Sequence, residues 1–453
     1  MDNKDNLLAK ANQPAIEAMK LHPFYKGKIE VVPKVCIRDI SDFAIWYTPG
    51  VAKPCLDIRD NPDAVFEHTN KGNTIAVVSD GTRVLGLGDI GPAAGLPVME
   101  GKALLFKYLG GVDVFPLMID TKDADKIIET VLLLQPGLGG INLEDIAMPK
   151  CFRILDELRA KASIPIWHDD QQGTATVTVA GFINALRIVD KKINEVKIAM
   201  IGAGASNYRI AKLLITAGVN AENIIMTDTK GILHKNREDR KELETKYKEK
   251  WDICTITNGR NVTGGIPEAM KGADAVIALS TPGPGVIKKE WVKTMTSQAI
   301  VFACANPTPE IWPWEAKEAG ARVVATGRSD FPNQVNNSLG FPGIFRGTLD
   351  VQARTITDEM CIAAAYELAQ LALDKGLDEE HLLPTMDDWE VFPREAAAVG
   401  MKAIEQGVAR KKRTHDELFR MAVEKISRAR GLTRMMMDTG FISIPSRFVM
   451  MGD

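Results

Sequence analysis

Short β-rich runs alternate with helical stretches from residue 164 onward, and this alternation constrains the fold more than any other feature of the chain. Helical stretches over 173–188 and 208–217 separate the first three runs. Strands that alternate with helices in this way form a mostly parallel sheet with helices on its faces. The sequence therefore predicts an α/β fold with a doubly wound sheet. The β-rich runs cover residues 164–167, 197–201, 223–227, 273–279, 299–303 and 322–325.

The chain has 453 residues, which exceeds a single core of roughly 100–200 residues, so we expect more than one domain. Residues 1–165 are predicted to form an N-terminal α/β domain. Residues 166–355 are predicted to form the doubly wound domain, and residues 356–453 a helical C-terminal segment. Within the first part, the apolar run 74–78 and the run 83–89 flank a polar turn, which predicts a β-hairpin.

The composition excludes several classes of protein. The formal net charge is −3, from 56 basic and 59 acidic residues, whereas a dedicated nucleic-acid-binding protein is normally basic over a whole face. No run of 18 apolar residues occurs, so we expect no membrane span. The six cysteines are scattered without a CxxC pair, and the first residues lack the basic and then apolar layout of a secretory signal. We therefore expect a reducing compartment, the cytoplasm.

A glycine-rich turn follows the predicted strand 197–201. Such a turn lets the backbone approach a pyrophosphate at a helix N-terminus, which is typical of a Rossmann-type dinucleotide-binding domain. Asp228 ends the next predicted strand, where an acid would bind the adenosine ribose. Asp228 would also repel a 2′-phosphate, which favours NAD over NADP unless Lys230 and Lys235 offset its charge. A glycine-rich turn without any ligand is the alternative. The candidate cofactor-binding residues of the turn are Gly202, Gly204, Ala205, Ser206 and Asn207.

Two pairs of adjacent acids stand beside glycine-rich or strand-end positions, Glu144 with Asp145 and Asp169 with Asp170. Adjacent carboxylates repel each other unless a cation or solvent compensates, and oxygen-rich sets of this kind suit Mg²⁺ or Mn²⁺. The second pair follows the run 164–167, so we expect it at the carboxyl end of a strand, where open α/β sheets bind ligands. Taken singly, such a pair is more often a surface feature at a helix N-terminus.

Several other polar residues are unremarkable when each is taken alone, namely Tyr47, Lys102, Asn306 and Asn337. Together with the acids and the glycine-rich turn, however, the stretches that contain them resemble the malic enzyme family, over roughly residues 20–350. The compact length is similar to that of the small prokaryotic branch. The stretches that carry the resemblance are 47–51, 79–89, 100–103, 142–145, 168–174, 202–207, 306–308 and 336–337.

The resemblance implies a role for each matching residue. It makes Lys102 the general base, whose pKa would have to fall from about 10.4 toward about 7–8. Tyr47 matches the general acid and Asp169 the supporting aspartate of the catalytic set. The implied metal ligands are Glu144, Asp145 and Asp170. The implied substrate-facing or nicotinamide-facing groups are Arg83, Asn306 and Asn337, with Asn306 also counted toward the cofactor.

The function implied by the resemblance is oxidative decarboxylation of (S)-malate to pyruvate and CO₂. It would use NAD or NADP, with NAD favoured, together with Mg²⁺ or Mn²⁺. The implied partners are a small-molecule substrate and further copies of the chain, with a dimer favoured. A non-redox oxaloacetate decarboxylase or malolactic-type lyase on the same scaffold is the first alternative, and a catalytically silent metabolite-binding protein is the second. Two residues depart from the family pattern: Asn207 replaces the third glycine, and Gln172 stands where many small relatives have histidine.

Overall fold

Two β-sheets form the framework of the protein, whose computed structural model describes residues 2–445, with side chains from residue 13 onward. The first sheet has the strand order β2-β1-β3-β4, and all its neighbouring strands are parallel. The second has the order β10-β9-β8-β5-β6-β7, in which only β7 of the described strands is antiparallel. The strands of the first sheet are β1 (Thr74–Ser79), β2 (Asp113–Met118), β3 (Gly140–Leu143) and β4 (Ile166–His168). Those of the second are β5 (Ile198–Ile201), β6 (Ile224–Asp228), β7 (Gly231–Ile232), β8 (Ala275–Ala278), β9 (Ala299–Ala303) and β10 (Ala321–Thr326).

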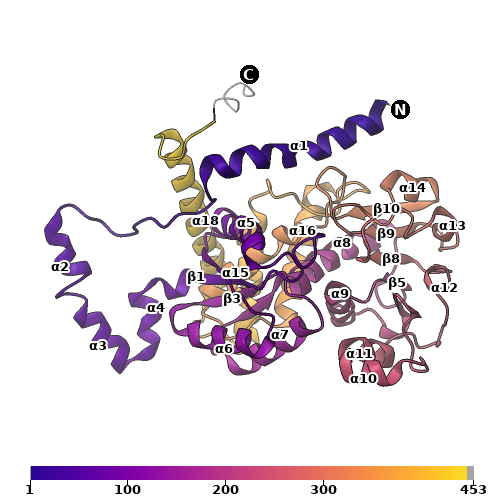
Figure 1. Ribbon diagram of the computed structural model, residues 1–453, viewed down its shortest axis with the longest axis horizontal. Helices are drawn as coiled ribbons and strands as arrows, with labels where there is room; N and C mark the ends of the chain where they lie inside the picture. The colour runs from indigo at the N-terminus through magenta and orange to yellow at the C-terminus, as the bar shows by residue number, and fades with distance from the viewer. Residues whose placement is uncertain (1, 446–453) are drawn as a thin grey trace.

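Helices cover both sheets, and a helical C-terminal segment follows them (Figure 1). This arrangement confirms the predicted α/β fold. The helices of the first part are α1 (Asp2–Tyr25), α2 (Phe43–Trp46), α3 (Ala52–Asp60), α4 (Val65–His68), α5 (Pro92–Gly110), α6 (Ala124–Leu134) and α7 (Lys150–Lys161). Those around the second sheet are α8 (Thr174–Ile188), α9 (Ala205–Thr216), α10 (Arg240–Lys246), α11 (Lys248–Ile256), α12 (Ile266–Met270), α13 (Lys289–Val292) and α14 (Pro313–Glu318). The last four are α15 (Phe341–Asp350), α16 (Asp358–Gly376), α17 (Val391–Glu405) and α18 (His415–Asp438).

The predicted β-hairpin is wrong. Residues 74–79 form β1, an interior strand that pairs in parallel with β2 and β3, and all six of its residues are buried. Residues 83–89 form a loop that is closed by a bridge between Val84 and Gly88. An uninterrupted apolar run is typical of a parallel strand that is covered on both faces, whereas a half-exposed hairpin strand alternates. No strand is predicted at β3 from the sequence, because its glycine and asparagine have low β-propensity.

The parallel register brings the carboxyl ends of three strands to one edge of the first sheet. Val78 of β1 lies opposite Leu143 of β3, and Leu143 lies opposite His168 of β4. Residues that directly follow these strands therefore come close together in space. Because β4 pairs with β3, the first sheet continues to His168, beyond the domain boundary predicted at residue 165.

A continuous cluster of buried side chains joins the two sheets. It includes Ile75 of β1, Trp167 of β4, Phe182 of α8 and Phe302 of β9. The C-terminal helices strengthen this connection, because α16 packs against α8 while α15 and α18 pack against α5. The two sheets therefore hold fixed positions relative to each other.

One segment lies outside this core. Residues 29–63, here called the arm, include α2 and α3 and project away from both sheets at the far left of Figure 1. Asp42 is the one buried residue of the arm. Among the described helices, none has the length and apolar character needed to cross a bilayer.

A buried carboxyl group in α17 gives a test of this packing. Glu395 is fully buried against Gly343 of α15, and neither of its carboxyl oxygens has a hydrogen-bond partner among the described residues. Burial, with a smaller contribution from the charge of Glu367, raises the pKa of Glu395 well above its ordinary value. The folded protein therefore holds this proton more tightly than the unfolded chain does.

We predict that Glu395→Gln changes the pH dependence of stability. In the parent, the contribution of Glu395 is full below the unfolded pKa of about 4.3 and falls as pH rises toward the folded pKa, by up to about 1.4 kcal/mol per pH unit. The variant lacks this loss, so its free energy of unfolding relative to the parent should rise between about pH 5 and pH 8. Urea unfolding at several pH values measures the difference, with Glu390→Gln, at the exposed N-cap of the same helix, as the control. A difference that stays constant with pH would contradict the prediction.

Candidate active site

Three carboxylates gather at the carboxyl-terminal edge of the first sheet. Glu144 and Asp145 follow β3, and Asp170 lies in the short π-helical turn η5 (Asp169–Gly173) that follows β4. One oxygen atom from each of the three side chains lies within 4.8 Å of the others. The backbone N–H of Asp145 donates to Oδ2 of Asp170 at 2.8 Å, which joins the two strand ends. The fold thus brings together the three acids that were expected to form one set.

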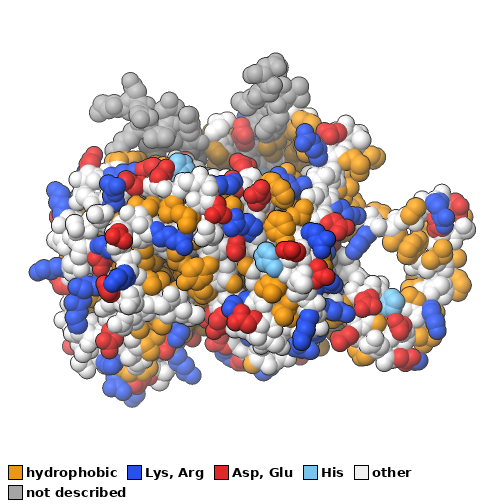
Figure 2. All heavy atoms as spheres, turned by 180° about the vertical axis from the view of Figure 1, so that it is seen from behind, with side chains coloured by type: hydrophobic (Ala, Val, Ile, Leu, Met, Phe, Trp, Pro, Cys, Tyr) orange, Lys and Arg blue, Asp and Glu red, His pale blue; other side chains and the backbone are white. Residues whose placement is uncertain are grey.

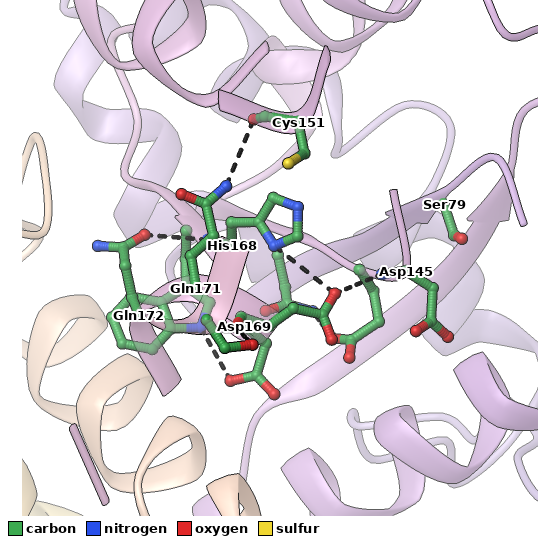
Figure 3. Close-up of polar contacts among 12 residues, drawn as sticks. Ser79, Asp145, Cys151, His168, Asp169, Gln171 and Gln172 are labelled. Carbon is green, nitrogen blue, oxygen red and sulfur yellow. Dashed lines mark hydrogen bonds and ion pairs between the residues drawn. The ribbon is translucent and has the colours of Figure 1, made fainter. Parts of the chain in front are cut away.

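Lys102 of α5 lies between this cluster and a fourth acid. Its Nζ is 2.6 Å from Oδ2 of Asp169 and 3.1 Å from Oε1 of Glu144. Asp169 is fully buried, and it also accepts hydrogen bonds from Nδ2 of Asn337 at 2.5 Å and from Nε1 of Trp167 at 3.1 Å. These contacts fix both the lysine and the aspartate. Figure 3 shows Asp169 together with the polar residues that surround the end of β4.

The cluster carries more negative charge than one lysine neutralises. Burial, together with the charge of Asp170, raises the pKa of Asp145 to about 8. Burial also raises the pKa of Glu144 and of Asp170, although Lys102 acts in the opposite direction on both. Burial therefore holds all three acids away from the ordinary ionised state, and the charges of neighbouring acids add to this effect for Glu144 and Asp145.

The pKa of Lys102 is raised, whereas the role of general base implied by the resemblance requires a lowered pKa. Burial alone would lower it, but the charges of Asp169, Glu144 and Asp170 outweigh burial and raise the pKa above its ordinary value. The chain's own carboxylates thus favour the protonated lysine. A lowered pKa requires a positive charge that offsets them.

A divalent cation fits this set of donors. All three groups offer carboxylate oxygens, which Mg²⁺ and Mn²⁺ prefer. Oδ2 of Asp145 is buried and has no hydrogen-bond partner among the described residues, so one oxygen remains available. Glu144, Asp145 and Asp170 are therefore the residues that would hold such an ion.

His168 is a buried residue of the site to which the sequence assigned no role. Its ring nitrogen Nδ1 lies 3.7 Å from Oδ2 of Asp170, and burial lowers the pKa of the ring to about 4 (Figure 3). The backbone N–H of His168 donates to Oε1 of Gln172 at 3.0 Å. The side chain of Gln172 thus holds the end of β4 in place through this hydrogen bond. Many small relatives were expected to have histidine at this position. His168 could have been predicted to lie in the site from its position directly before Asp169 and Asp170.

The glycine-rich turn after β5 faces the carboxylate cluster from the second sheet. Gly202 has φ +98°, and a Cβ there would lie 2.7 Å from the carbonyl oxygen of Leu279, so this position requires glycine. A Cβ on Gly204 would meet nothing within 4 Å, which leaves open space beside the turn. Helix α9 begins at Ala205 without a side-chain cap, so its first N–H groups remain available to an anion. Ser206 Oγ donates to the carbonyl oxygen of Asp170 at 2.8 Å, which links the turn to the acids.

Asn207 has a definite function in this turn. Its side chain is fully buried, and its Nδ2 donates to the carbonyl oxygens of Ile201 at 2.9 Å and Gly202 at 2.8 Å. The residue that replaces the third glycine therefore ties α9 to the end of β5 and holds the turn in place.

Asp228 ends β6, as predicted, but its neighbours differ from those expected. Oδ1 is 2.8 Å from Nη1 of Arg237, and Oδ2 is 3.0 Å from Nζ of Lys250. Burial would raise the pKa of Asp228, but the hydrogen bonds from these two cations hold it below its ordinary value. Lys230 instead pairs with Asp239 at 3.0 Å, and Lys235 is exposed. Arg237 and Lys250 could not be found from the sequence, because no motif marks them.

The remaining candidate residues lie on loops around the site. Arg83 is exposed, its backbone N–H donates to the carbonyl oxygen of Asp145 at 2.9 Å, and its charge acts to lower the pKa of Asp170. Asn306 follows β9 and is exposed. A Cβ on Gly86 would lie 2.9 Å from the carbonyl oxygen of Asn306, so the loop that carries Arg83 contacts the loop after β9.

Tyr47 is the one candidate that the structure does not bring to this site. It follows α2 on the arm, and its side chain is 71% exposed. Figure 1 places α2 at the end of the molecule that lies farthest from the second sheet. Within a single chain, Tyr47 and the acid cluster are therefore apart.

The fold and the site together define an enzyme that uses a dinucleotide cofactor: a glycine-rich turn faces buried carboxylates and a lysine across two joined sheets. Comparison with known proteins agrees. The malic enzyme N-terminal domain matches residues 26–159, and the malic enzyme NAD-binding domain matches residues 171–408. This chain belongs to the malic enzyme family.

Individual relatives resemble nearly the whole chain. The bifunctional malic/malolactic enzyme of Bacillus subtilis is 48% identical over 394 residues, covering 87% of this chain and 94% of the relative. The NAD-dependent malic enzyme of Geobacillus stearothermophilus is 48% identical over 386 residues, covering 85% of this chain and 78% of the relative. The crystal structure of the Entamoeba histolytica malic enzyme is 49% identical, with a TM-score of 0.93, covering 98% of this chain and 92% of that one.

We predict that Asp170→Asn weakens Mn²⁺ binding without weakening the fold. Removing one of three charges should raise the Mn²⁺ dissociation constant at least about tenfold. The same change relieves repulsion, so the thermal midpoint in EDTA should equal or exceed that of the parent. Isothermal titration calorimetry measures the first effect and thermal unfolding the second, with the exposed Asp89→Asn as the control. Unchanged Mn²⁺ affinity in Asp170→Asn would show that the ion binds elsewhere.

Proposed function

We propose that this chain oxidatively decarboxylates (S)-malate to pyruvate and CO₂, with reduction of NAD⁺ or NADP⁺ and with Mg²⁺ or Mn²⁺ at the acid cluster. The observation that carries the proposal is the position of Lys102, 2.6 Å from Asp169 and 3.1 Å from Glu144, in a site that faces a dinucleotide turn. A base, a set of metal ligands and a hydride acceptor then lie together. The family membership of the chain supports the same reaction.

A divalent cation and a nicotinamide cofactor would supply two parts of the chemistry. When bound, the divalent cation polarises the oxygen on C2 as a Lewis acid, and the nicotinamide ring accepts the hydride from C2. The chain supplies the proton transfers and the binding. Lys102 accepts the proton of the C2 hydroxyl, and Asp169 holds Lys102 in place. Arg83 suits a substrate carboxylate, because its planar guanidinium binds two oxygens at once.

The carboxamides of Asn306 and Asn337 are placed to bind polar groups of the substrate or of the nicotinamide. Asn337 donates to Asp169, which fixes its orientation. Asn306 lies on the loop that contacts the loop of Arg83. These two asparagines would therefore orient the substrate between the sheets rather than exchange protons with it.

Lys102 must be neutral when it accepts the hydroxyl proton, although the neighbouring acids favour its protonated form. A divalent charge at Glu144, Asp145 and Asp170 would offset that influence. We infer that metal binding and deprotonation of Lys102 are coupled, so that the base becomes available when the site is loaded. Tyr47 would then supply the proton that C3 receives after CO₂ has left.

NAD is the proposed cofactor, and Asp228 with its two cations would set the preference. Asp228 can accept hydrogen bonds from ribose hydroxyls while Arg237 and Lys250 hold it ionised. A small pocket beside the turn is lined by Ala203, Tyr247 and Lys250. With both cations occupied by Asp228, little positive charge remains for a 2′-phosphate.

Three further assignments belong to the proposal. The six cysteines are free thiols, four of them buried, which is consistent with a reducing cytoplasm. We propose a homodimer, because the arm exposes apolar side chains that a single chain does not cover. The proposed domains are 1–165 for catalysis, 166–355 for cofactor binding and 356–453 for the helical segment, with β4 joined to the first domain because it pairs with β3.

The experiment that tests the function is a stoichiometry measurement. With (S)-malate, Mn²⁺ and NAD⁺, absorbance at 340 nm and product analysis should give one NADH and one pyruvate for each malate consumed. A malolactic activity is the second candidate, because the Bacillus subtilis relative is named a bifunctional malic/malolactic enzyme. Lactate without net NADH would support that candidate and contradict the proposal.

We predict that Asp228→Ser shifts the cofactor preference toward NADP⁺. The change removes the acceptor for the ribose hydroxyls and releases Arg237 and Lys250 to meet a 2′-phosphate. The ratio of kcat/KM for NADP⁺ to that for NAD⁺ should rise at least about tenfold, the effect of roughly 1.4 kcal/mol. The exposed Lys235→Ala serves as the control and should leave the ratio unchanged. If Lys235→Ala moves the ratio and Asp228→Ser does not, the assignment to Asp228 is wrong.

A further inference from the structure

Glu310 is a buried acid that the mechanism proposed above does not use. It lies in the loop after β9, and its side chain is completely buried, whereas Figure 2 shows charged side chains at many places on the visible surface. Oε1 accepts hydrogen bonds from the backbone N–H of Ser280 at 2.8 Å and from its Oγ at 3.1 Å. Oε2 accepts a hydrogen bond from the backbone N–H of Ala305 at 3.1 Å. Both oxygens of the carboxylate are therefore used.

The donors of these hydrogen bonds belong to two different loops. Ser280 lies in the loop after β8, residues 279–288, which is here called the β8 loop. Ala305 lies in the loop after β9, directly before Asn306. The side chain of Glu310 therefore joins the β8 loop to the residues that follow β9.

Backbone hydrogen bonds strengthen the contact between the two loops. The carbonyl oxygen of Glu310 accepts hydrogen bonds from the backbone N–H groups of Gly285 and Ile287, both at 3.1 Å. The backbone N–H of Gly283 donates to the carbonyl oxygen of Thr308 at 3.1 Å. A Cβ on Gly283 or on Gly285 would meet nothing within 4 Å. The β8 loop is thus held through its backbone and leaves open space beside both glycines.

The carboxylate of Glu310 is buried without a counter-charge. Among the described residues no lysine or arginine pairs with it, and burial raises its pKa, while the hydrogen bonds from Ser280 and Ala305 act in the opposite direction. Burying an acid without a cation costs free energy, so packing alone would favour a neutral side chain at this position. A carboxylate differs from an amide because both of its oxygens accept hydrogen bonds. The acid is therefore suited to hold N–H groups of two loops at once.

The strand order places the two loops on one side of the position where a dinucleotide would bind. From β5 the chain continues to β6 on one side, whereas β8 and β9 lie on the other side, so the order reverses between β5 and β8 (Figure 1). Dinucleotides bind across such a reversal, at the carboxyl ends of the strands. Asp228 ends β6, on the side proposed for the adenosine ribose. The loops after β8 and β9 would therefore face the nicotinamide half.

Close contacts connect these loops with the rest of the site. A Cβ on Gly202 of the dinucleotide turn would lie 3.1 Å from Cβ of Ser280. A Cβ on Gly86, in the loop that carries Arg83, would lie 2.9 Å from the carbonyl oxygen of Asn306. The two loops that Glu310 joins thus reach from the dinucleotide turn to the loop of Arg83.

We propose that Glu310 is a positioning residue that holds the β8 loop and Asn306, through Ser280 and Ala305, where they orient the nicotinamide ring for hydride transfer. The inference rests on the proposed function, because it takes NAD as the cofactor. Glu310 exchanges no proton with the substrate and acts only through the two loops. The adenosine end of the cofactor, which the dinucleotide turn and Asp228 would hold, does not depend on it.

Glu310→Gln tests this proposal with little change in side-chain volume. Nε2 of the glutamine cannot accept a hydrogen bond, so one of the two loops loses its partner. The dissociation constant for NADH, measured by nucleotide fluorescence, should rise at least about fivefold, the effect of one lost hydrogen bond. The dissociation constant for ADP-ribose, which lacks the nicotinamide ring, should stay within about twofold of the parent value, because its site is independent.

Two further variants complete this binding experiment. Glu290→Gln is the matched control, because it removes the same charge from an exposed position just after the β8 loop and should change neither dissociation constant. Ser280→Ala removes one donor to Glu310 and leaves the carboxylate in place, so it serves if Glu310→Gln does not fold. It should raise the dissociation constant for NADH about threefold and leave that for ADP-ribose unchanged.

Two results would overturn the proposal. Equal weakening of NADH and ADP-ribose binding would show that Glu310 only stabilises the second sheet and its loops. Unchanged NADH binding in both Glu310→Gln and Ser280→Ala would show that the two loops do not act on the nicotinamide ring.

A kinetic measurement then examines the hydride step itself. Rapid mixing of the enzyme with (S)-malate, NAD⁺ and Mn²⁺ gives the rate of NADH formation in the first turnover at 340 nm. In Glu310→Gln this rate should fall at least about tenfold, because a small displacement of the reacting atoms slows the transfer. The Mn²⁺ dissociation constant, measured by calorimetry, should equal that of the parent, because the acid cluster lies at the edge of the first sheet. A parent-like rate in the first turnover would contradict the positioning role.

The two measurements separate this proposal from the proposed function. Binding of NADH and ADP-ribose does not require malate turnover. If the parent binds NADH but does not oxidise malate, the proposed function fails, and the comparison of the two ligands still decides whether Glu310 positions the nicotinamide ring.

Discussion

Buried negative charge at one edge of the first sheet is the constraint on which the site depends. Lys102 contacts Asp169 and Glu144, while Asp145 and Asp170 complete a group of four acids around one lysine. Burying carboxylates costs free energy unless each is paired with a charge or with hydrogen-bond donors. One ammonium group is not enough, which is why burial and mutual repulsion raise the pKa of Asp145 to about 8. A divalent cation at Glu144, Asp145 and Asp170 would remove this conflict and would supply the Lewis acid that the proposed reaction needs.

The fold creates this concentration of charge through parallel pairing. Because β1, β3 and β4 run in the same direction, the residues after β3 and β4 arrive at one edge. The shared core holds the second sheet so that Ser206, at the start of α9, reaches the backbone of Asp170. The dinucleotide turn and the acids are thus parts of one rigid arrangement. The arm is the exception, because Asp42 is the one buried residue of 29–63, all of which the structure describes.

Much of the site could be predicted because strand ends carry recognisable residues. Asp170 follows an apolar run and Gly202 follows another, so pattern and spacing alone indicated both, and family resemblance added Lys102. Pairing could not be predicted in the same way: the run at β1 suits a hairpin or a parallel strand until its neighbours are known. Arg237 and Lys250 reach Asp228 through tertiary folding and have no local signal. For Tyr47, the family resemblance implied a role in the site, but the residue lies on the arm after α2, away from the acid cluster of its own chain.

The central claim is that the acid cluster is a divalent-cation site, and anomalous X-ray diffraction tests it most directly. Crystals of the full chain grown with MnCl₂ would be measured at wavelengths on both sides of the manganese absorption edge. The account predicts one strong anomalous peak among the carboxylates of Glu144, Asp145 and Asp170. A manganese peak elsewhere in the molecule, with none among these three acids at a concentration that saturates activity, would contradict it.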